Sequence, residues 1–384
     1  MKTVRKKLAV VTTHPIQYNA PLFKLMSNEL DFETMVFYTW GEASIGSKYD
    51  PDFGQEIEWD IPLLDGYQYT FVDNVSDDPG SHHFNGIINP TLNREIQAWH
   101  ADVVWVWGWA FNSHLKVLRN FKGKVPVWFR GDSTLLNEPL GLSLRKIARR
   151  LFLRWVYKHI DKAFFVGAHN KAYFFAHGLQ DSQLVFAPHA IDNERFKDPT
   201  GILAEDARNW RRDLEIADNK KILIYVGKFE QKKNPLFFKK IVAKLEDEDF
   251  VGIMVGNGSL EDELRNSASS NLLFLPFQNQ SKMPVVYRLA DVLILPSKGP
   301  GETWGLVMNE ALASGIKVLA SHNCGGAIDL LDETRIFQLN ESDVVNKIYE
   351  VLRESKKKNV IYKEFDIKYS YAKVVESILS ELRN

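Results

Sequence analysis

Two lysines near the middle of the chain have the type and spacing to neutralise a diphosphate. Lys228 and Lys233 stand five residues apart in VGKFEQKKNP (226–235), directly after an apolar stretch that predicts a strand. Ammonium groups in a turn at the carboxyl end of a strand can balance the charge of two phosphates. An ordinary solvated charged loop is the alternative, and Lys232 beside Lys233 supports it.

Two glutamates follow in PSKGPGETWGLVMNEALASG (296–315). Glu302 lies where a loop meets a helix predicted over 304–314, and Glu310 comes eight residues later. Eight residues is a little over two helical turns, so both carboxylates are expected on one side of the helix. The alternative is that Glu302 is only a charge at the helix N-terminus and that Glu310 is solvated.

The start of the same helix is a second candidate phosphate site. N–H groups of a first helical turn have no acceptor within the helix, and the helix dipole favours an anion there. Here these groups belong to Gly305, Leu306 and Val307. The segment 226–235 is not a Walker A loop, and VGNGS (255–259) lacks the third glycine of a dinucleotide-binding turn.

These residues follow apolar runs that predict the strands of parallel sheets. The runs are continuously apolar rather than alternating, as expected of strands covered on both faces. They lie at 8–13, 103–107, 125–129, 163–167, 222–227, 251–256, 292–297 and 316–321. Helix-patterned segments separate them at 142–159, 235–245, 304–314 and 342–353. This alternation predicts an α/β fold.

A polar, charged segment at 189–220 separates two strand–helix series. The 384 residues are enough for two or three domains, and two domains are favoured over one sheet of ten or more strands. We expect two Rossmann-like, doubly wound domains facing a central cleft, because open α/β sheets bind ligands outside the carboxyl ends of their strands.

Composition narrows the function classes. The net charge is −1, from 48 basic and 49 acidic residues, which disfavours a dedicated nucleic-acid binder. No apolar run reaches the roughly 18–20 residues of a spanning helix, and the apolar run before His14 is too short for a signal peptide. A single cysteine, Cys324, fits a reducing cytoplasm, which is the predicted location.

Two Asp-x-Asp triplets, Asp50/Asp52 and Asp247/Asp249, raise the question of a metal site. Pro51 stiffens the first triplet, and the second precedes its strand instead of following it. Both are therefore predicted to be surface acidic loops. No metal and no other cofactor is expected.

Four features of the second half keep a fixed order along the chain. They are G-K-F-x-x-x-K at 227–233, the VGNG turn at 255–258, ADVLILPS at 290–297, and E-x7-E from Glu302 to Glu310. Together they resemble a GT-B-fold glycosyltransferase of family 4, the retaining group that uses nucleotide-sugar donors. The opening THPIQYNAPLFKLM (13–26) is similar to a subgroup found in cell-surface polysaccharide assembly.

The resemblance implies a role for each matching residue. The donor diphosphate is expected on Lys228 and Lys233, the donor-sugar hydroxyls on Glu302, and the ribose hydroxyls on Glu310. The implied backbone contacts are those of Gly305 and Leu306 with the phosphates, and those of 273–277, ending at Phe277, with the base. The negative charge that grows on the leaving diphosphate would be stabilised by the lysines and helix N–H groups.

The resemblance is thinner over the first half. The first loop carries His14 where relatives often have two glycines, and Arg130-Gly131-Asp132 stands where relatives often have a His-Gly-x-Asp-like element. His14, Asp132 and His114 are the candidates for the catalytic polar group there. A lone histidine is more often structural than catalytic.

The implied organisation is an acceptor-side domain at 1–198, a donor-binding domain at 199–365 and a C-terminal helix at 366–384 that crosses back to the first domain. The implied reaction moves a sugar, with retention, from a nucleotide-diphosphate sugar to a hydroxyl of a glycan or lipid-linked acceptor. One alternative is a nucleotide-sugar-binding protein that has lost catalysis. Another is a nicotinamide-dependent oxidoreductase, against which the first strand lacks a following GxGxxG turn.

The segment 144–158 is basic and amphipathic, with no acidic residue between Glu138 and Asp161. Its cations are Arg145, Lys146, Arg149, Arg150, Arg154 and Lys158. Its predicted inward face consists of Ile147, Ala148, Leu151 and Trp155, with Leu153 and Tyr157 among the cations. An ordinary helix packed on the sheet is one interpretation. The other adds peripheral contact with anionic lipid, or with a lipid-diphosphate acceptor, at the inner face of the membrane.

Overall fold

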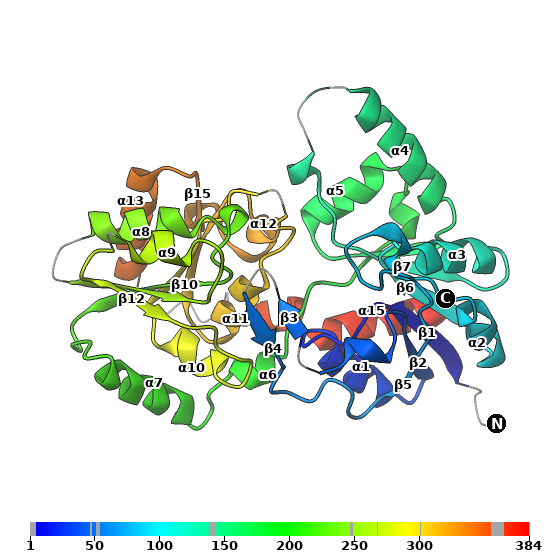
Figure 1. Ribbon diagram of the computed structural model, residues 1–384, viewed down its shortest axis with the longest axis horizontal. Coiled ribbons are helices and arrows are strands. Elements are labelled where there is room, and N and C mark those ends of the chain that lie inside the picture. The colour runs from blue at the N-terminus through cyan, green and yellow to red at the C-terminus, as the bar shows by residue number, and fades with distance from the viewer. Residues whose placement is uncertain are drawn as a thin grey trace. The chain divides into compact units, whose positions relative to one another are not determined.

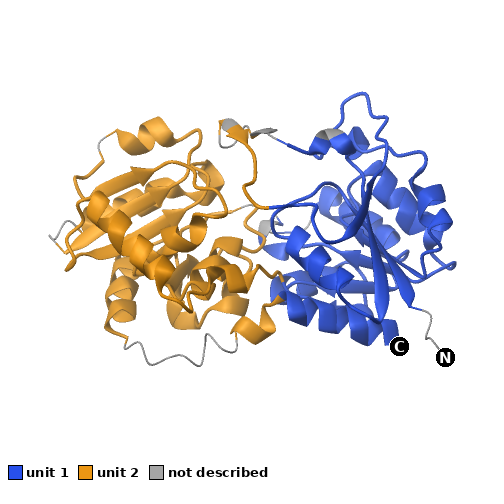
Figure 2. Cartoon of the chain, turned by 90° about the horizontal axis from the view of Figure 1, so that it is seen from below, with its two compact units in different colours: residues 1–46, 62–188, 371–384 blue, residues 47–61, 189–370 orange. Residues whose placement is uncertain are grey.

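The computed structural model describes residues 5–46, 48–50, 54–138, 141, 143–245, 249–266, 268–299, 301–354 and 365–383. The chain folds into two compact units, shown in blue and orange in Figure 2. Unit 1 comprises 1–46, 62–188 and 371–384, and unit 2 comprises 47–61 and 189–370. Each unit contains a large parallel sheet, so the predicted α/β class is confirmed.

Unit 1 is built on a sheet with the strand order β5-β2-β1-β6-β7-β8-β9. The strands are β1 (Lys6–Thr12), β2 (Phe32–Tyr38), β5 (Gln68–Phe71), β6 (Val103–Trp107), β7 (Val127–Arg130), β8 (Lys162–Phe165) and β9 (Leu184–Phe186). Leu8 and Val10 of β1 belong to one core cluster, and Ala9 and Val11 belong to another. Both faces of the sheet are therefore covered, which explains the continuously apolar run.

The helices of unit 1 divide between these two faces (Figure 1). They are α1 (Ala20–Ser27), α2 (Leu92–Ala98), α3 (Asn112–Phe121), α4 (Leu144–Tyr157), α5 (Ala168–Ala176) and α15 (Tyr371–Arg383). Phe23 of α1 and Ile378 of α15 join the cluster of Leu8. Leu118 of α3 and Leu153 of α4 join the cluster of Ala9.

Of the four residues predicted for the inward face of α4, Trp155 packs against the core of unit 1, but the other three are exposed, so most of the prediction is wrong. Ile147 and Leu151 are 45% and 61% exposed, whereas Leu153 and Tyr157 are buried. The reason is an aromatic cluster over the sheet, in which the Tyr157 ring lies 5.7 Å from that of Phe129. The sheet therefore receives Leu153, Val156 and Tyr157, and an apolar stripe of α4 is left on the outer side.

Unit 2 has a sheet with the strand order β12-β11-β10-β13-β14-β15. The strands are β10 (Lys221–Val226), β11 (Phe250–Val255), β12 (Leu272–Leu275), β13 (Val292–Leu295), β14 (Lys317–Ser321) and β15 (Ile336–Phe337). A small antiparallel hairpin, β3 (Lys48–Asp50) and β4 (Gln55–Ile57), also belongs to this unit.

The helices of unit 2 alternate with its strands. They are α6 (Asn193–Phe196), α7 (Ile202–Asp213), α8 (Pro235–Lys244), α9 (Glu261–Arg265), α10 (Met283–Arg288), α11 (Leu306–Ala313), α12 (Ala327–Leu330) and α13 (Glu341–Arg353). Phe238 of α8 and Ile348 of α13 pack with Leu223 and Tyr225 of β10 in one core cluster.

The unit boundaries differ by several residues from the predicted domain limits of 198/199 and 365/366. The compact units divide after Pro188 and after Ser370. Packing explains the shift, because the Phe196 ring lies 6.1 Å from that of Tyr287 and the Tyr369 ring lies 6.0 Å from that of Trp304. The segments that follow Pro188 and precede Tyr371 are therefore part of the core of unit 2.

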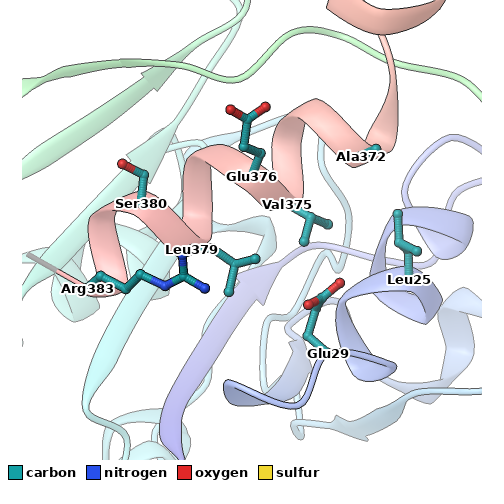
Figure 3. A pocket seen from close by; sticks show the side chains of 8 residues that line it. All are labelled: Leu25, Glu29, Ala372, Val375, Glu376, Leu379, Ser380 and Arg383. Atoms are coloured by element: carbon teal, nitrogen blue, oxygen red, sulfur yellow. The ribbon is translucent and has the colours of Figure 1, made fainter.

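A pocket of about 590 Å³ lies between α1 and α15 in unit 1 (Figure 3). Its lining includes Leu25, Glu29, Val375, Leu379 and Arg383. These residues belong to the two helices, except Glu29, which follows α1, so the pocket is not at the strand ends where open α/β sheets bind ligands. Among the described residues, none of the helices combines the length and the apolar character needed to cross a bilayer.

Candidate functional site

The strand order of unit 2 identifies the edge at which a ligand is expected. Successive strands run outward from β10 in one direction and from β13 in the other, and β10 pairs directly with β13. Such a reversal leaves a crevice at the carboxyl ends of the two strands. The loop after β10 carries Lys228 and Lys233, and the loop after β13 carries Glu302.

Hydrogen bonds hold these two loops together. The side-chain amide of Asn234 donates to the Pro296 carbonyl at 3.1 Å. The backbone N–H of Lys298 donates to the Lys232 carbonyl at 3.0 Å. Asn234 has a left-handed backbone (φ 56°), which asparagine tolerates better than most residues, and it turns the chain into α8. The positions of the charged side chains are thus fixed by backbone contacts.

Lys233 and Glu302 form an ion pair between the loops. The Lys233 ammonium lies 2.5 Å from Oε2 of Glu302, and the Ser297 hydroxyl donates to the same oxygen at 2.9 Å. Glu302 is 7% exposed. Two of the predicted site residues are therefore in direct contact, and the interpretation of Lys233 as part of a solvated charge run is excluded.

The loop after β14 supports the backbone on which Glu302 stands. The N–H of Gly325 donates to the Glu302 carbonyl, and that of Gly326 donates to the Trp304 carbonyl, both at 3.0 Å. A Cβ at position 325 would lie 1.9 Å from the Thr303 carbonyl oxygen, so only glycine fits there. This support was not predicted, although the adjacent glycines after a predicted strand are a sequence signal for it.

Lys228 is paired with Asp50. Its ammonium lies 3.0 Å from both oxygens of that carboxylate, at the end of β3. The prediction that Asp50 belongs to a surface acidic loop is thus wrong, because the hairpin folds onto unit 2 and places the carboxylate on a half-buried cation. Asp249 is exposed, as predicted, while Asp52 and Asp247 lie outside the described residues.

The helix after Glu302 begins later than predicted. Helix α11 starts at Leu306, with Gly305 in a left-handed conformation (φ 94°) as its N-cap. Glu302 therefore lies in the turn before the helix, and the expectation that both glutamates share one helical face is wrong. The N–H groups of Leu306 and Val307 occupy the first turn, where a helix has no internal acceptors for them.

Glu310 is in the middle of α11 and is 2% exposed. It accepts a hydrogen bond of 2.6 Å from the hydroxyl of Tyr287 on α10. The alternative of a solvated surface charge is therefore wrong. Trp304 lies just before α11, and its indole N–H donates to the side chain of Asn309 within the helix at 2.8 Å. This hydrogen bond connects the turn before α11 to the middle of the helix.

Phe277 lies at the end of the segment that follows β12. Its N–H donates to the Asn257 side chain at 2.8 Å, and Asn257 is the third residue of the VGNG turn. The Phe277 ring meets that of Trp59 edge-on at 6.2 Å. Trp59 comes from the 47–61 segment of unit 2 and was not predicted.

In unit 1, His14 follows β1, which pairs with β6 at the corresponding reversal of strand order. Its Nδ1 lies 2.9 Å from the Thr13 hydroxyl, and its ring meets Trp40 edge-on at 5.0 Å. Asp132 follows β7, so β6 separates the strands that carry these two candidates.

Arg130 and His114 of unit 1 are structural. The Arg130 guanidinium donates to the carbonyls of Ala187 and Pro188 at 2.9 and 3.0 Å. Burial lowers its pKa to about 10, which leaves it charged at neutral pH. Burial lowers the pKa of His114 to about 4, so this residue is neutral, and its Nδ1 donates to the Gly108 carbonyl at 2.9 Å.

Most of unit 2 is similar to a known protein family. Residues 206–365 match the family model "Glycosyl transferases group 1". The matched range contains Lys228, Lys233, Phe277, Glu302 and Glu310. These residues, which are expected to contact a nucleotide-sugar donor, therefore lie in the glycosyltransferase-like segment.

Relatives and solved structures extend this match. An uncharacterized glycosyltransferase of Methanocaldococcus jannaschii is 28% identical over 133 residues, which is 33% of each chain. The putative colanic acid biosynthesis glycosyl transferase of Escherichia coli is 25% identical over 130 residues, 33% of this chain and 31% of that protein. The chain thus spans about a third of the length of these curated relatives.

The Anabaena protein HepE, solved with UDP and glucose, superimposes on 99% of this chain and 100% of its own with a TM-score of 0.67 and 13% identity. At that identity the likeness shows the fold alone. The fold is GT-B, with two Rossmann-like units.

The contact between Tyr287 and Glu310 gives a first prediction. Tyr287→Phe leaves a buried carboxylate without that donor, at an expected cost of about 1–3 kcal/mol in the free energy of unfolding. Urea unfolding of Tyr287→Phe, Glu310→Ala and the double variant measures the coupling between the two side chains. We expect a coupling of about 1 kcal/mol or more. A coupling below roughly 0.5 kcal/mol, as found for independent residues, would contradict the contact.

Proposed function

We propose that the chain is a retaining glycosyltransferase of family 4. It would transfer a sugar from a nucleotide-diphosphate sugar to a hydroxyl of a glycan or lipid-linked acceptor in cell-surface polysaccharide synthesis. The observation that carries this proposal is the contact of Lys233 with Glu302 at the strand reversal of unit 2. This contact lies inside the range that matches the Glycosyl transferases group 1 model.

The proposed chemistry concentrates charge on the leaving diphosphate. The bond from the anomeric carbon to the β-phosphate oxygen breaks, the acceptor oxygen bonds to the same face of that carbon, and the acceptor proton goes to the leaving phosphate. Lys228, Lys233 and the N–H groups at Gly305 and Leu306 stabilise the growing negative charge. Because the charge is larger in the transition state than in the bound donor, these contacts accelerate the step.

The two lysines have different carboxylate partners, which suggests unequal roles. Lys228 is paired with Asp50, and Lys233 is paired with Glu302, which also accepts from the Ser297 hydroxyl. If Glu302 holds the donor-sugar hydroxyls, its contact with Lys233 sets the sugar beside the phosphate to which it is attached. Lys233 is then the principal cation for the diphosphate.

The remaining donor contacts are proposed for Glu310 and for the segment that ends at Phe277, both in unit 2. Glu310 is proposed to bind the ribose hydroxyls, and the backbone near Phe277 is proposed to bind the base. HepE, which was solved with UDP and with UDP-glucose, supports a uridine nucleotide as the first donor to test. In unit 1, His14 and Asp132 are the proposed polar groups on the acceptor side.

Helix α4 supports peripheral membrane contact. Leu144, Ile147 and Leu151 lie on one face of this helix and are 86%, 45% and 61% exposed. Glu138 pairs with Lys146 at 3.2 Å and lies 3.9 Å from Arg150. The exposed cations Arg145, Arg154 and Lys158 are on the same helix or directly after it, whereas Arg149 points away from the stripe and donates to the Tyr173 hydroxyl at 3.3 Å. We propose that the stripe enters the headgroup region of an anionic bilayer on the cytoplasmic side.

Lys233→Ala tests the reaction itself. We expect hydrolysis of a UDP-sugar without acceptor to be measurable in the wild type and to fall about 100- to 1,000-fold in the variant, since a transition-state charge contact is lost. Lys228→Ala should lose less activity. Lys232→Ala removes the adjacent lysine, which pairs with Glu230 instead of Glu302, and should stay within about twofold of the wild type.

The fold of Lys233→Ala needs its own control, because Glu302 would be buried without its cation. The double variant Lys233→Ala/Glu302→Gln removes that unpaired charge, so its thermal unfolding should approach the wild type while its turnover stays low. A wild type that binds UDP-sugars but hydrolyses none would favour the non-catalytic binding protein. Lys233→Ala activity within twofold of wild type would remove the diphosphate site.

Variants of the two glutamates should differ in their affinity for the nucleotide. Glu310→Ala should weaken binding of the bare nucleoside diphosphate, because the ribose is present in nucleotide and nucleotide sugar alike. Glu302→Ala should not weaken that affinity, because it frees the Lys233 ammonium for the diphosphate, but it should lower turnover of the intact donor. Calorimetry with UDP, GDP and ADP measures the first effect and identifies the base. Equal losses of nucleotide affinity in both variants would contradict the division of roles.

Vesicle flotation tests α4. Wild-type protein should float with anionic vesicles at low salt and detach at about 1 M salt, where the Debye length is near 3 Å. Replacing Arg145, Arg154 and Lys158 with glutamine should abolish flotation and spare donor hydrolysis. The matched control replaces the exposed Arg94, Arg208 and Arg212, with the same change in net charge, and should still float. Equal loss of flotation in both triple variants would show that overall charge, and not α4, is responsible.

A further inference from the structure

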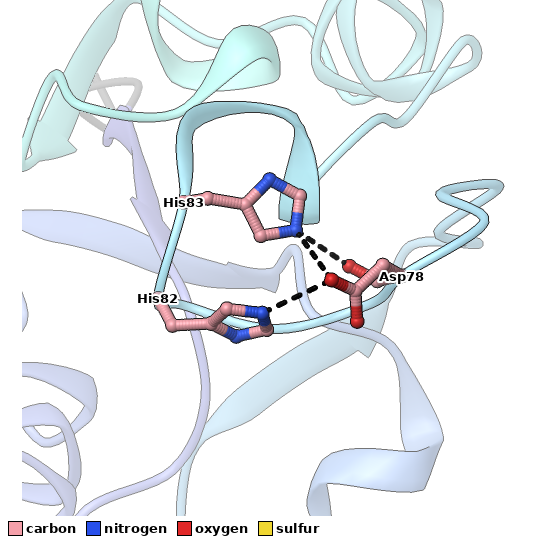
Figure 4. Close-up of side chains that lie close together, drawn as sticks. All are labelled: Asp78, His82 and His83. Atoms are coloured by element: carbon pink, nitrogen blue, oxygen red, sulfur yellow. Dashed lines mark hydrogen bonds and ion pairs between the residues drawn. The ribbon is translucent and has the colours of Figure 1, made fainter.

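Three side chains that could ligate a metal ion converge in a loop of unit 1, between β5 and α2. Nε2 of His82 and Nε2 of His83 each lie 3.2 Å from the same carboxylate oxygen of Asp78 (Figure 4). Nε2 of His83 also lies 3.0 Å from the Asp78 carbonyl. The two imidazole rings are 4.6 Å apart between centroids, so adjacent histidines turn toward one point instead of away from each other.

The loop that presents these side chains is held in shape by its own hydrogen bonds. The side chain of Asn74 accepts from the N–H groups of Ser76 at 3.2 Å and Ile88 at 2.9 Å. It also donates to the Gly86 carbonyl at 2.8 Å. The Ser76 hydroxyl donates to the Asn85 carbonyl at 2.7 Å. The two ends of the loop are thereby joined on either side of the cluster.

One glycine makes room for the cluster itself. Gly80 donates its N–H to the Gly86 carbonyl at 3.0 Å, which closes the loop beneath His82. A Cβ at position 80 would lie 2.4 Å from Nδ1 of His82 and would displace the ring. The backbone is therefore compatible with this orientation of His82 only because residue 80 is glycine.

The donor set selects a class of ion. Two imidazole nitrogens with one carboxylate oxygen suit zinc and the other late first-row divalent ions, whereas calcium and magnesium prefer oxygen ligands. Ligand bonds of about 2.0–2.2 Å to a tetrahedral ion place neighbouring donor atoms roughly 3.3–3.5 Å apart. The observed spacing of 3.2 Å between each imidazole nitrogen and the carboxylate oxygen is close to that value.

We propose that Asp78, His82 and His83 form a binding site for a divalent transition-metal ion, with zinc as the reference ion. The ion would take the place of the hydrogen-bonded protons and cross-link the loop. Asp78 and His82 have side-chain exposures of 72% and 62%, so solvent can reach the ion and fill the fourth position. None of the three residues belongs to the proposed donor site, so the inference is independent of the glycosyltransferase proposal.

The test is calorimetric titration of folded protein, without a polyhistidine tag, with zinc chloride. We expect one high-affinity zinc ion per chain in the wild type. His82→Ala, His83→Ala and Asp78→Asn should each weaken that affinity about tenfold or more, since each removes one of three ligands. The matched control is His100→Asn, which removes an exposed histidine outside the cluster and keeps a residue that tolerates its left-handed backbone (φ 58°).

Cobalt gives a second readout that non-specific binding would not reproduce. Tetrahedral cobalt absorbs far more strongly in the visible range than octahedral cobalt, so loading the wild type should produce an intense band that His82→Ala/His83→Ala lacks. The proposal is overturned if the wild type binds zinc no tighter than His82→Ala/His83→Ala. It is equally overturned if His100→Asn weakens zinc binding as much as the cluster variants do, or if cobalt shows only the weak octahedral spectrum.

Discussion

The parallel pairing of β10 with β13 is the constraint on which the candidate site depends. It places Leu223 beside Val292 and Ile224 beside Leu293, although about 70 residues separate the two strands in sequence. The chain continues from β10 to one side of the sheet and from β13 to the other side. The loops that follow β10 and β13 therefore lie next to each other at the carboxyl ends of these two strands. Lys233 and Glu302 meet for that reason, and the hydrogen bonds between the two loops then fix the ammonium against the carboxylate.

Because Glu302 and Glu310 are buried, their carboxylates need partners in the folded protein. Removing a carboxylate from water costs several kcal/mol unless it is paired, and both Glu302 and Glu310 are supplied with donors. Such pairs add little net stability, but breaking one is costly, so they favour one arrangement of the loops. Behind Glu302, burial raises the pKa of the Cys324 thiol to about 12, so this cysteine stays protonated and adds no competing negative charge.

The fold class and the charged part of the site could be read from the sequence because both depend on local order. Apolar runs mark the strands, and the lysines and glutamates stand at fixed distances after them. Asp50 and Trp59 could not be found in this way, since they reach the site from a segment far away in sequence, whereas Gly325 follows a predicted strand and its adjacent glycines indicate such a loop. The inward face of α4 was missed because the helix has apolar residues on two sides. A helical wheel shows both sides, but it does not show which of them packs against the aromatic cluster around Phe129. The start of α11 depended on the left-handed Gly305, which spacing does not reveal.

The hairpin of β3 and β4 has a consequence for how the chain can be divided. Unit 2 takes in residues 47–61, which lie within the first part of the sequence. A fragment cut at 189–370 would contain every strand of its parallel sheet but would leave Lys228 without Asp50 and Phe277 without Trp59. A chimaera of two homologous chains that are joined at one point near residue 189 would lose the same contacts, because its hairpin and its parallel sheet would come from different proteins. Unit 2 is thus encoded discontinuously, and a graft of it has to carry the hairpin as well.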